Sequence, residues 1–143
     1  MPEQPEGQPQ SQDARREQAA FWLSYGRELW GAIRYAEALA AVERALALAP
    51  DDPAAWYLRG ACLCLLARHE EALASFEEAL RRDGRYVPAW DGKAWALGVL
   101  GRRAEALAAV EEALRLDPDY LQARLRKARL QATAEVDPER RER

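Results

Sequence analysis

Apolar residues recur three and four positions apart from about residue 13 to residue 134. This spacing places them on one face of an α-helix. The strong helix formers Ala, Leu, Glu and Arg dominate, and no run alternates apolar and polar residues as a strand would. Clustered Pro and Gly interrupt the pattern, and Asp52 is placed to cap a helix that begins at Pro53. We therefore predict an all-α chain of about seven helices, near 13–31, 35–48, 53–66, 69–82, 87–99, 103–116 and 119–134.

The same pattern of residues occurs three times in the sequence, at a constant interval. The blocks AEAL, EEAL and AEAL begin at Ala36, Glu70 and Ala104, which are 34 residues apart both times. A period of this length is typical of arrays in which each unit covers its neighbour, and about three units are needed for stability. The short turns between the helices predict that neighbours in the chain pack antiparallel.

Two complementary stripes repeat with the same interval. On the first helix of each pair, one face carries a large, a small and an apolar residue: Trp22, Gly26, Leu29; Trp56, Gly60, Leu63; Trp90, Ala94, Leu97. The second helix carries the reverse order, small, large and small: Ala38, Val42, Ala45; Ala72, Phe76, Ala79; Ala106, Val110, Ala113. A small residue lets another helix approach closely, so we expect these stripes to pack against each other within a stacked solenoid.

These residues, with a closing proline at Pro50 and Pro118, resemble the tetratricopeptide repeat. The resemblance covers three units, about 19–52, 53–86 and 87–120, which is about 70% of the 143 residues. It implies a right-handed superhelical solenoid of antiparallel helix pairs. The departures are mild: Gly84 replaces the proline, and His69 and Arg103 replace the aromatic residue seen at Tyr35.

The last predicted helix, 119–134, begins like a fourth unit but has polar residues in the stacking positions. Arg124 takes the place of the tryptophan and Gln131 that of the leucine. We interpret it as a capping helix, which makes 13–134 one repeat domain. Residues 1–12 and 135–143 are predicted to be tails, the first because its Gln, Pro, Glu and Gly residues cannot bury enough apolar surface.

Charge and composition exclude several classes of function. The formal net charge is −3 and the basic residues are interspersed with acidic ones, so we expect no nucleic-acid partner. No stretch is long and apolar enough to insert in a membrane. The N-terminus has no pattern of an export signal, which predicts a cytoplasmic location and free thiols at the two cysteines.

Nothing in the sequence indicates catalysis. With one histidine, His69, three serines and no Gly-rich loop, there is no nucleophile–base arrangement and no phosphate site. Cys62 and Cys64 point about 200° apart on a helix and cannot bind one metal ion together. We read them as packing or surface residues, with a reactive thiol at Cys64 as the alternative. The expectation is a non-enzyme without cofactor or metal.

The resemblance implies that the stripe beside the core stripe lines a concave groove that holds a partner's peptide. It lies one, five and eight residues after each tryptophan position: Leu23, Arg27, Trp30, Tyr57, Ala61, Cys64, Asp91, Trp95, Gly98, Leu125, Arg129, Ala132. Exposed aromatic residues are costly on a wet surface, and Trp, Tyr and Arg are enriched in binding hot spots. The predicted partner-binding residues are Leu23, Arg27, Trp30, Tyr57, Cys64, Asp91, Trp95 and Arg129. The expected partner is an extended or helical protein segment with apolar and acidic residues.

Several alternatives stay open. One alternative is that the aromatic residues are covered by one another or by the N-terminal tail and bind no partner. A second is that the chain is a small chaperone for an export or assembly client. A third is that it self-associates through its convex or terminal surfaces. A chaperone-tail clamp of this family needs Lys and Asn, but Asn is absent and Leu58, Pro88 and Gly92 fill the clamp positions. The basic run 124–129, RLRKAR, is predicted to be a solvated cap, with docking of an acidic partner as the alternative.

Overall fold

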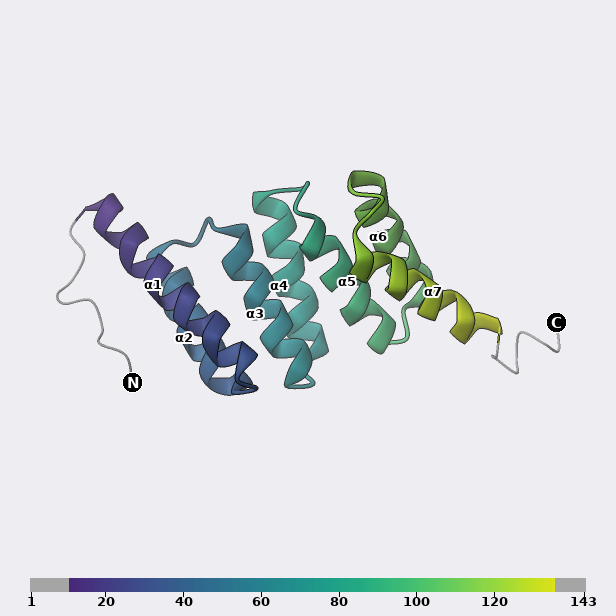
Figure 1. The fold of residues 1–143 in the computed structure, drawn as a ribbon, viewed down its shortest axis with the longest axis horizontal. Coiled ribbons are helices and arrows are strands. Elements are labelled where there is room, and N and C mark those ends of the chain that lie inside the picture. The colour runs from purple at the N-terminus through teal and green to yellow at the C-terminus, as the bar shows by residue number, and fades with distance from the viewer. Residues whose placement is uncertain (1–10, 136–143) are drawn as a thin grey trace.

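The computed structural model describes residues 11–135, which form seven α-helices and no strand (Figure 1). The helices are α1 (Gln12–Gly31), α2 (Tyr35–Leu48), α3 (Pro53–Leu65), α4 (His69–Arg82), α5 (Val87–Val99), α6 (Arg103–Leu116) and α7 (Leu121–Glu135). The all-α prediction is confirmed, and every helix end lies within two residues of its predicted place. The predicted tails lie outside the described residues, except at their inner ends, where Gln12 and Glu135 are helical.

Local signals explain where the helices begin. The Ser11 hydroxyl accepts a hydrogen bond from the Ala14 N–H at 3.0 Å and caps α1. Asp52 caps α3 in the same way, through the Ala54 N–H at 3.0 Å, as its place before Pro53 predicts. These caps satisfy backbone donors that have no partner inside a helix.

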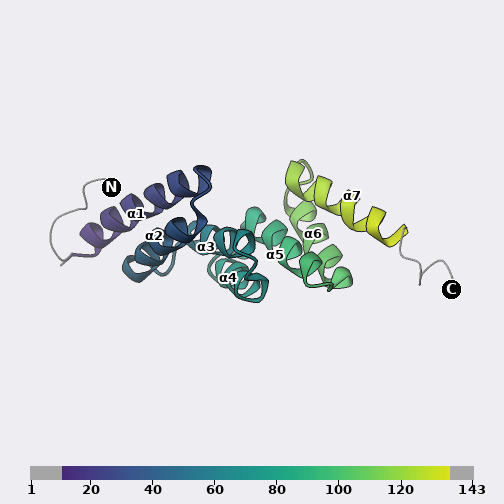
Figure 2. The same cartoon turned by 90° about the horizontal axis from the view of Figure 1, so that it is seen from below.

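The helices form antiparallel pairs that stack side by side in chain order. The pairs are α1 with α2, α3 with α4 and α5 with α6, and α7 packs on the last pair (Figure 1). The first helices also contact one another in sequence, α1 with α3, α3 with α5 and α5 with α7. In Figure 2 this row is concave, because α1 and α7 rise on either side of α3 and α5. The predicted solenoid of helix pairs is confirmed.

Small residues on the first helices receive large residues from the second helices. A Cβ added to Gly26 would lie 2.9 Å from Val42, and one added to Gly60 would lie 2.6 Å from Phe76. Phe76 also fills the space beside Gly92 of the next unit. Its side chain is fully buried, so one ring joins the second helix pair to the third. The predicted complementary stripes therefore form the core.

The tryptophans are less buried than the stripe pattern predicts. Trp22 is buried, but Trp56 and Trp90 are only half-buried. Their indole N–H groups donate to the carbonyls of Pro50 at 2.7 Å and Gly84 at 2.9 Å, in the loops that precede their helices. These indole rings thus fasten the loop between two units, because a Trp side chain brings a polar N–H that needs a partner.

An exposed ion pair repeats at the start of each second helix. Arg34 pairs with Glu37, Arg68 with Glu71 and Arg102 with Glu105, at N–O distances of 2.5 to 2.7 Å. Exposed pairs of this kind contribute little to stability. Among residues 11–135, no helix has the length and the apolar character needed to cross a membrane.

Candidate protein-binding groove

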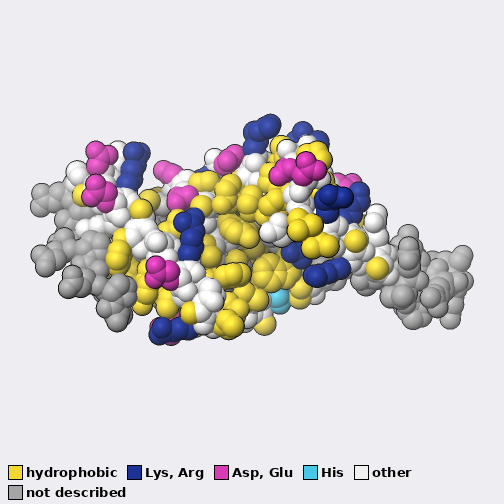
Figure 3. All heavy atoms as spheres, viewed as in Figure 1, with side chains coloured by type: hydrophobic (Ala, Val, Ile, Leu, Met, Phe, Trp, Pro, Cys, Tyr) yellow, Lys and Arg dark blue, Asp and Glu magenta, His cyan; other side chains and the backbone are white. Residues whose placement is uncertain are grey.

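The concave face is formed by α1, α3, α5 and α7, the helices that carry the predicted stripe (Figure 2). In the space-filling view of this side, hydrophobic side chains gather over the centre of the row and charged side chains lie mostly toward its edges (Figure 3). We call this surface the groove. The sequence predicts that its lining consists of the residues that follow each tryptophan position by one, five and eight places.

Three aromatic residues of the predicted stripe reach the groove with part of their surface exposed. Trp30 on α1 is 37% exposed, and Tyr57 on α3 and Trp95 on α5 are half-buried. Trp30 contacts Tyr35 edge-on, with ring centroids 6.1 Å apart, and Tyr57 lies 5.8 Å from Phe76. Neighbouring rings therefore pack against Trp30 and Tyr57 and hold them in place, while part of each side chain stays exposed to solvent. Such rigid, amphipathic rings lose little conformational entropy when a partner covers them.

Three of the predicted partner-binding residues do not present a surface. Leu23, Cys64 and Asp91 are buried. The stripe runs along the first helices, which contact one another in sequence. These three side chains support the groove from below, whereas Arg27 and Arg129 are exposed as expected.

The alternative of a reactive thiol at Cys64 finds no support in its surroundings. Burial raises the pKa of the Cys64 thiol to about 12, although nearby Arg126 lowers it slightly. Burial likewise raises the pKa of Cys62 to about 11. A thiol needs its thiolate form to act as a nucleophile, and both groups are protonated at neutral pH. The two cysteines are packing residues.

Arg126 corrects the interpretation of the basic run on α7 as a solvated cap. Its guanidinium turns inward and donates to both carboxylate oxygens of Asp91, from Nε at 2.7 Å and from Nη2 at 3.2 Å. It also lies over the Trp95 ring, 5.6 Å from the centroid. Because Asp91 is buried, an ion pair with two hydrogen bonds is what allows its charge to stay there. The spacing could have indicated this contact, because Arg126 lies one place further along its 34-residue unit than Asp91 does along the preceding one.

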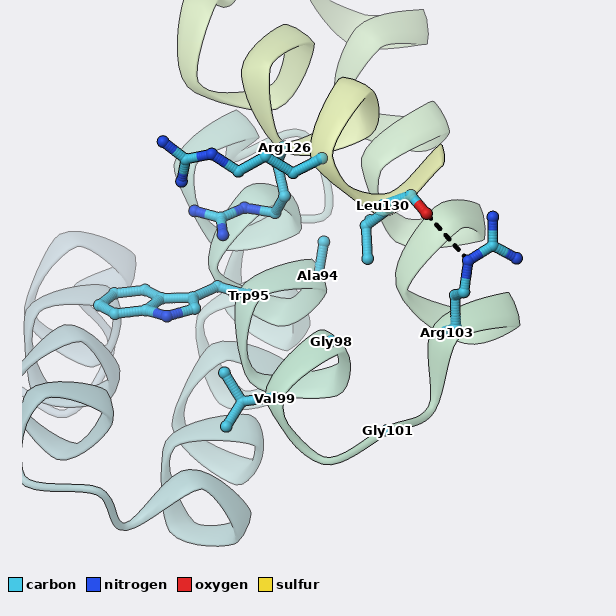
Figure 4. A pocket seen from close by; sticks show the side chains of 9 residues that line it. Ala94, Trp95, Gly98, Val99, Gly101, Arg103, Arg126 and Leu130 are labelled. Carbon is cyan, nitrogen blue, oxygen red and sulfur yellow. Dashed lines mark hydrogen bonds between the residues drawn. The ribbon is translucent and has the colours of Figure 1, made fainter. Parts of the chain in front are cut away.

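A pocket of about 350 Å³ opens at this end of the groove, between α5 and α7 (Figure 4). Its apolar wall includes Trp95, Val99 and Leu130, and Arg126 and Arg129 contribute positive charge. Arg103 Nε donates to the Leu130 carbonyl at 2.9 Å and ties α7 to the start of α6. The pocket combines an apolar surface with cations, which suits an apolar side chain close to a carboxylate.

Three tyrosines lie beside the groove, and two of them were missed by the sequence analysis. Tyr86 and Tyr120 directly precede first-helix positions, and Tyr57 and Tyr86 meet edge-on with centroids 6.1 Å apart. Burial raises the pKa of all three, and the carboxylate of Asp91 raises the pKa of Tyr57 and Tyr120 further. Tyr86 and Tyr120 are 34 residues apart, and this repeat interval could have identified them from the sequence.

No group of His, Cys, Asp and Glu side chains within residues 11–135 is arranged to hold a metal ion. His69 is the first residue of α4, where its Nδ1 atom is buried without a hydrogen-bond partner.

Comparisons with known proteins agree with this architecture. Residues 23–86 and 87–120 match two models of the tetratricopeptide repeat. The TPR domain of Arabidopsis OM64 has a TM-score of 0.78 and 22% identity, over 81% of this chain and 96% of that chain. The first TPR of Spaghetti (RPAP3), bound to the HSP90 peptide SRMEEVD, has a TM-score of 0.80 and 18% identity, over 85% and 96%.

The TPR2B domain of yeast Sti1, in complex with pHsp70, has a TM-score of 0.75 and 22% identity, over 83% of this chain and 98% of that chain. A search of curated protein sequences gives no match. Sequence identities this low show only a shared fold. The models of the tetratricopeptide repeat, in contrast, match most of the chain and show the family. The chain belongs to the tetratricopeptide repeat family, whose domains are non-catalytic protein-interaction modules.

Proposed function

We propose that the groove binds a segment of a partner protein, extended or helical, that carries apolar side chains and carboxylates. One observation supports this most: Trp30, Tyr57 and Trp95 are braced by neighbours yet keep exposed surface on the concave face. Arg27 and Arg129 are exposed beside them. Aromatic anchors with nearby arginines favour a partner that is apolar and acidic.

The apolar anchor of the partner would enter the pocket between α5 and α7. The pocket offers the Trp95 ring and the Val99 side chain, with the Arg126 guanidinium at its edge. Arg126 already pairs with Asp91, so a carboxylate of the partner would be attracted chiefly by the exposed Arg27. We expect the apolar contacts to supply most of the affinity and Arg27 to orient the segment.

Chaperone tails are not the partner that we propose. Structures similar to this chain hold the peptide SRMEEVD or an HSP70 peptide. In this chain the positions implied for a carboxylate clamp hold Leu58, Pro88 and Gly92, and Phe76 packs against Gly92. These side chains offer no positive charge for a terminal carboxylate.

The test is a pull-down with the tagged full chain from its native cell, read by mass spectrometry. A matched variant, Tyr57→Ala/Trp95→Ala/Arg27→Glu, is run beside it after its helix content is checked. We expect a partner that wild type recovers and the variant loses, and its binding segment is then measured as a synthetic peptide against SRMEEVD. Equal recovery by both chains would refute the groove proposal, and tighter binding of SRMEEVD would refute the exclusion of chaperone tails.

A further inference from the structure

Helix α7 has apolar residues on two opposite faces, and only one face is covered. Ala123 is buried, and Arg126 and Leu130 are half-buried against the body of the molecule. On the opposite side, Leu121 is 61% exposed and Leu125 is 51% exposed. Ala128 and Ala132 continue the same row and are exposed too. Spacings of four, three and four residues place this row, the outer stripe (Leu121, Leu125, Ala128, Ala132), on one face of the helix.

The preceding unit shows what the outer stripe is for. The residues of α5 that stand 34 positions earlier are Val87, Asp91, Ala94 and Gly98. Asp91 binds Arg126 of α7, Ala94 and Gly98 line the pocket that α7 closes, and a Cβ on Gly98 would lie 3.4 Å from Leu130. In α5 this row therefore faces the next helix. In α7 the same row is exposed, so it is a stacking face that lacks its helix.

Charge decides which kind of helix fits there. Arg124 and Arg129 flank the outer stripe, and residues 121–132 contain four basic residues and no acidic one. A second copy of α7 would bring arginines against arginines. A helix with acidic flanks is complementary.

We propose that the outer stripe of α7 docks an amphipathic helix of a partner protein, with apolar residues three and four apart and carboxylates on its flanks. The outer stripe covers twelve residues, about 17 Å of helix, so about three turns of the partner are enough. The partner's apolar side chains pack on Leu121 and Leu125, its backbone approaches Ala128, and its carboxylates pair with Arg124. The outer stripe shares Leu125 and Ala132 with the predicted groove stripe, but it contains none of the aromatic residues on which the function proposed for the groove rests, so the two proposals are tested separately.

The test uses the full chain and two fluorescent synthetic peptides of about 18 residues, long enough to span the outer stripe. Both peptides carry leucines at helical spacing, one with Glu flanks and the other with Lys flanks, and binding is read by fluorescence anisotropy. We expect the Glu-flanked peptide to bind more tightly. The variant Leu121→Glu/Leu125→Glu should weaken it by at least about tenfold, because both leucine contacts are lost. Both leucines are mainly exposed, so the variant should keep its helix content.

Two further variants separate this surface from the groove and test the charge argument. Trp30→Ala/Tyr57→Ala should leave binding of the Glu-flanked peptide within about twofold, because those side chains lie in the groove on α1 and α3. Arg124→Glu should weaken the Glu-flanked peptide and strengthen the Lys-flanked one. No binding of the Glu-flanked peptide, or binding unchanged by Leu121→Glu/Leu125→Glu, overturns the proposal. So does a dimer in sedimentation that this variant abolishes, since the occupant would then be a second copy.

Discussion

Ile33 adopts a backbone conformation that suits glycine. Its φ is 64°, and Ala67 and Gly101 occupy the same left-handed conformation at 34-residue intervals, with φ of 60° and 79°. Each of these residues turns the chain between the two helices of a pair, so the repeat requires the conformation whatever the side chain. A β-branched residue is the least suited to it, because its Cβ substituents crowd the backbone. Only the third unit uses the residue that the turn favours.

Replacing Ile33 by glycine should therefore stabilise the protein. The Ile33 side chain is 73% exposed, so little apolar burial is lost, and relief of the left-handed strain outweighs the greater freedom of glycine in the unfolded chain. We expect Ile33→Gly to raise the free energy of unfolding by about 0.5–1 kcal/mol in urea titrations. The matched change Gly101→Ala should act in the opposite direction. A loss of stability in Ile33→Gly would mean that its side chain has contacts that its exposure does not reveal.

Gly60→Ala should destabilise the core. The added methyl group would lie 2.6 Å from the Phe76 ring, which is buried on all sides and has no room to move. Overpacking of this kind costs roughly 1–3 kcal/mol in free energy of unfolding. Gly31→Ala is the control, because a Cβ there meets no atom within 4 Å, and it should be neutral or slightly stabilising. Equal effects of the two changes, measured by thermal unfolding, would argue against close packing at Gly60.

At the scale of the element, α7 is held by a few specific contacts. Ala123 is its one fully buried side chain among residues 121–132, and the Asp91–Arg126 pair and the Arg103 hydrogen bond complete the attachment. An element with so small a buried surface opens more easily than the core of the array. Its hold on the body thus depends on polar contacts that a single substitution can remove.

Arg126→Ala should loosen α7. It leaves the buried Asp91 carboxylate without its partner, and we expect a loss of about 2–3 kcal/mol, reduced from the range for fully buried pairs because Arg126 is 21% exposed. Hydrogen exchange should accelerate first in residues of α7. The double variant Asp91→Ala/Arg126→Ala should recover part of the loss, because no unpaired buried charge remains. Additive losses would show that the two side chains do not interact.

The helices and their pairing could be predicted from the sequence, but the side-chain contacts between units could not. Apolar spacing, Pro53 and the 34-residue interval determine where helices begin and end, because these are local properties. Arg126 turns inward only because Asp91, 35 residues earlier, is buried and needs a cation. Nothing local to the run RLRKAR distinguishes Arg126 from Arg124 or Arg129. Side-chain partners across units depend on how the pairs stack, which the sequence pattern does not specify.

At the scale of the whole molecule, burial of polar groups makes stability depend on pH. Burial raises the pKa of Cys62 to about 11 and of Cys64 to about 12, from an ordinary value of 9.0. Above pH 9 the unfolded chain releases these protons and the folded chain keeps them. Stability is therefore fully present below pH 9 and falls as pH rises toward 11 to 12.

We expect the free energy of unfolding, measured in guanidinium chloride, to decrease between pH 8 and pH 10.5. The variant Cys62→Ala/Cys64→Ala should be less stable at pH 8, because it leaves small cavities, but should lose less stability over the same interval. The buried tyrosines add to the loss only above about pH 10, their ordinary pKa. The same pH dependence in both chains would contradict the assignment to the thiols.

The place of Phe76 between Gly60 and Gly92 means that the units of this array are not interchangeable. The residue that stands 34 positions before Gly92 is Leu58, and the residue that stands 34 positions before Phe76 is Val42. A bulky ring thus precedes a unit with glycine, and a smaller valine precedes a unit with leucine. Copying the second unit in tandem would set Phe76 against Leu58. Lengthening this protein by simple gene duplication therefore requires a second, compensating substitution. The sizes of the side chains at the contacts between units determine which unit can follow which.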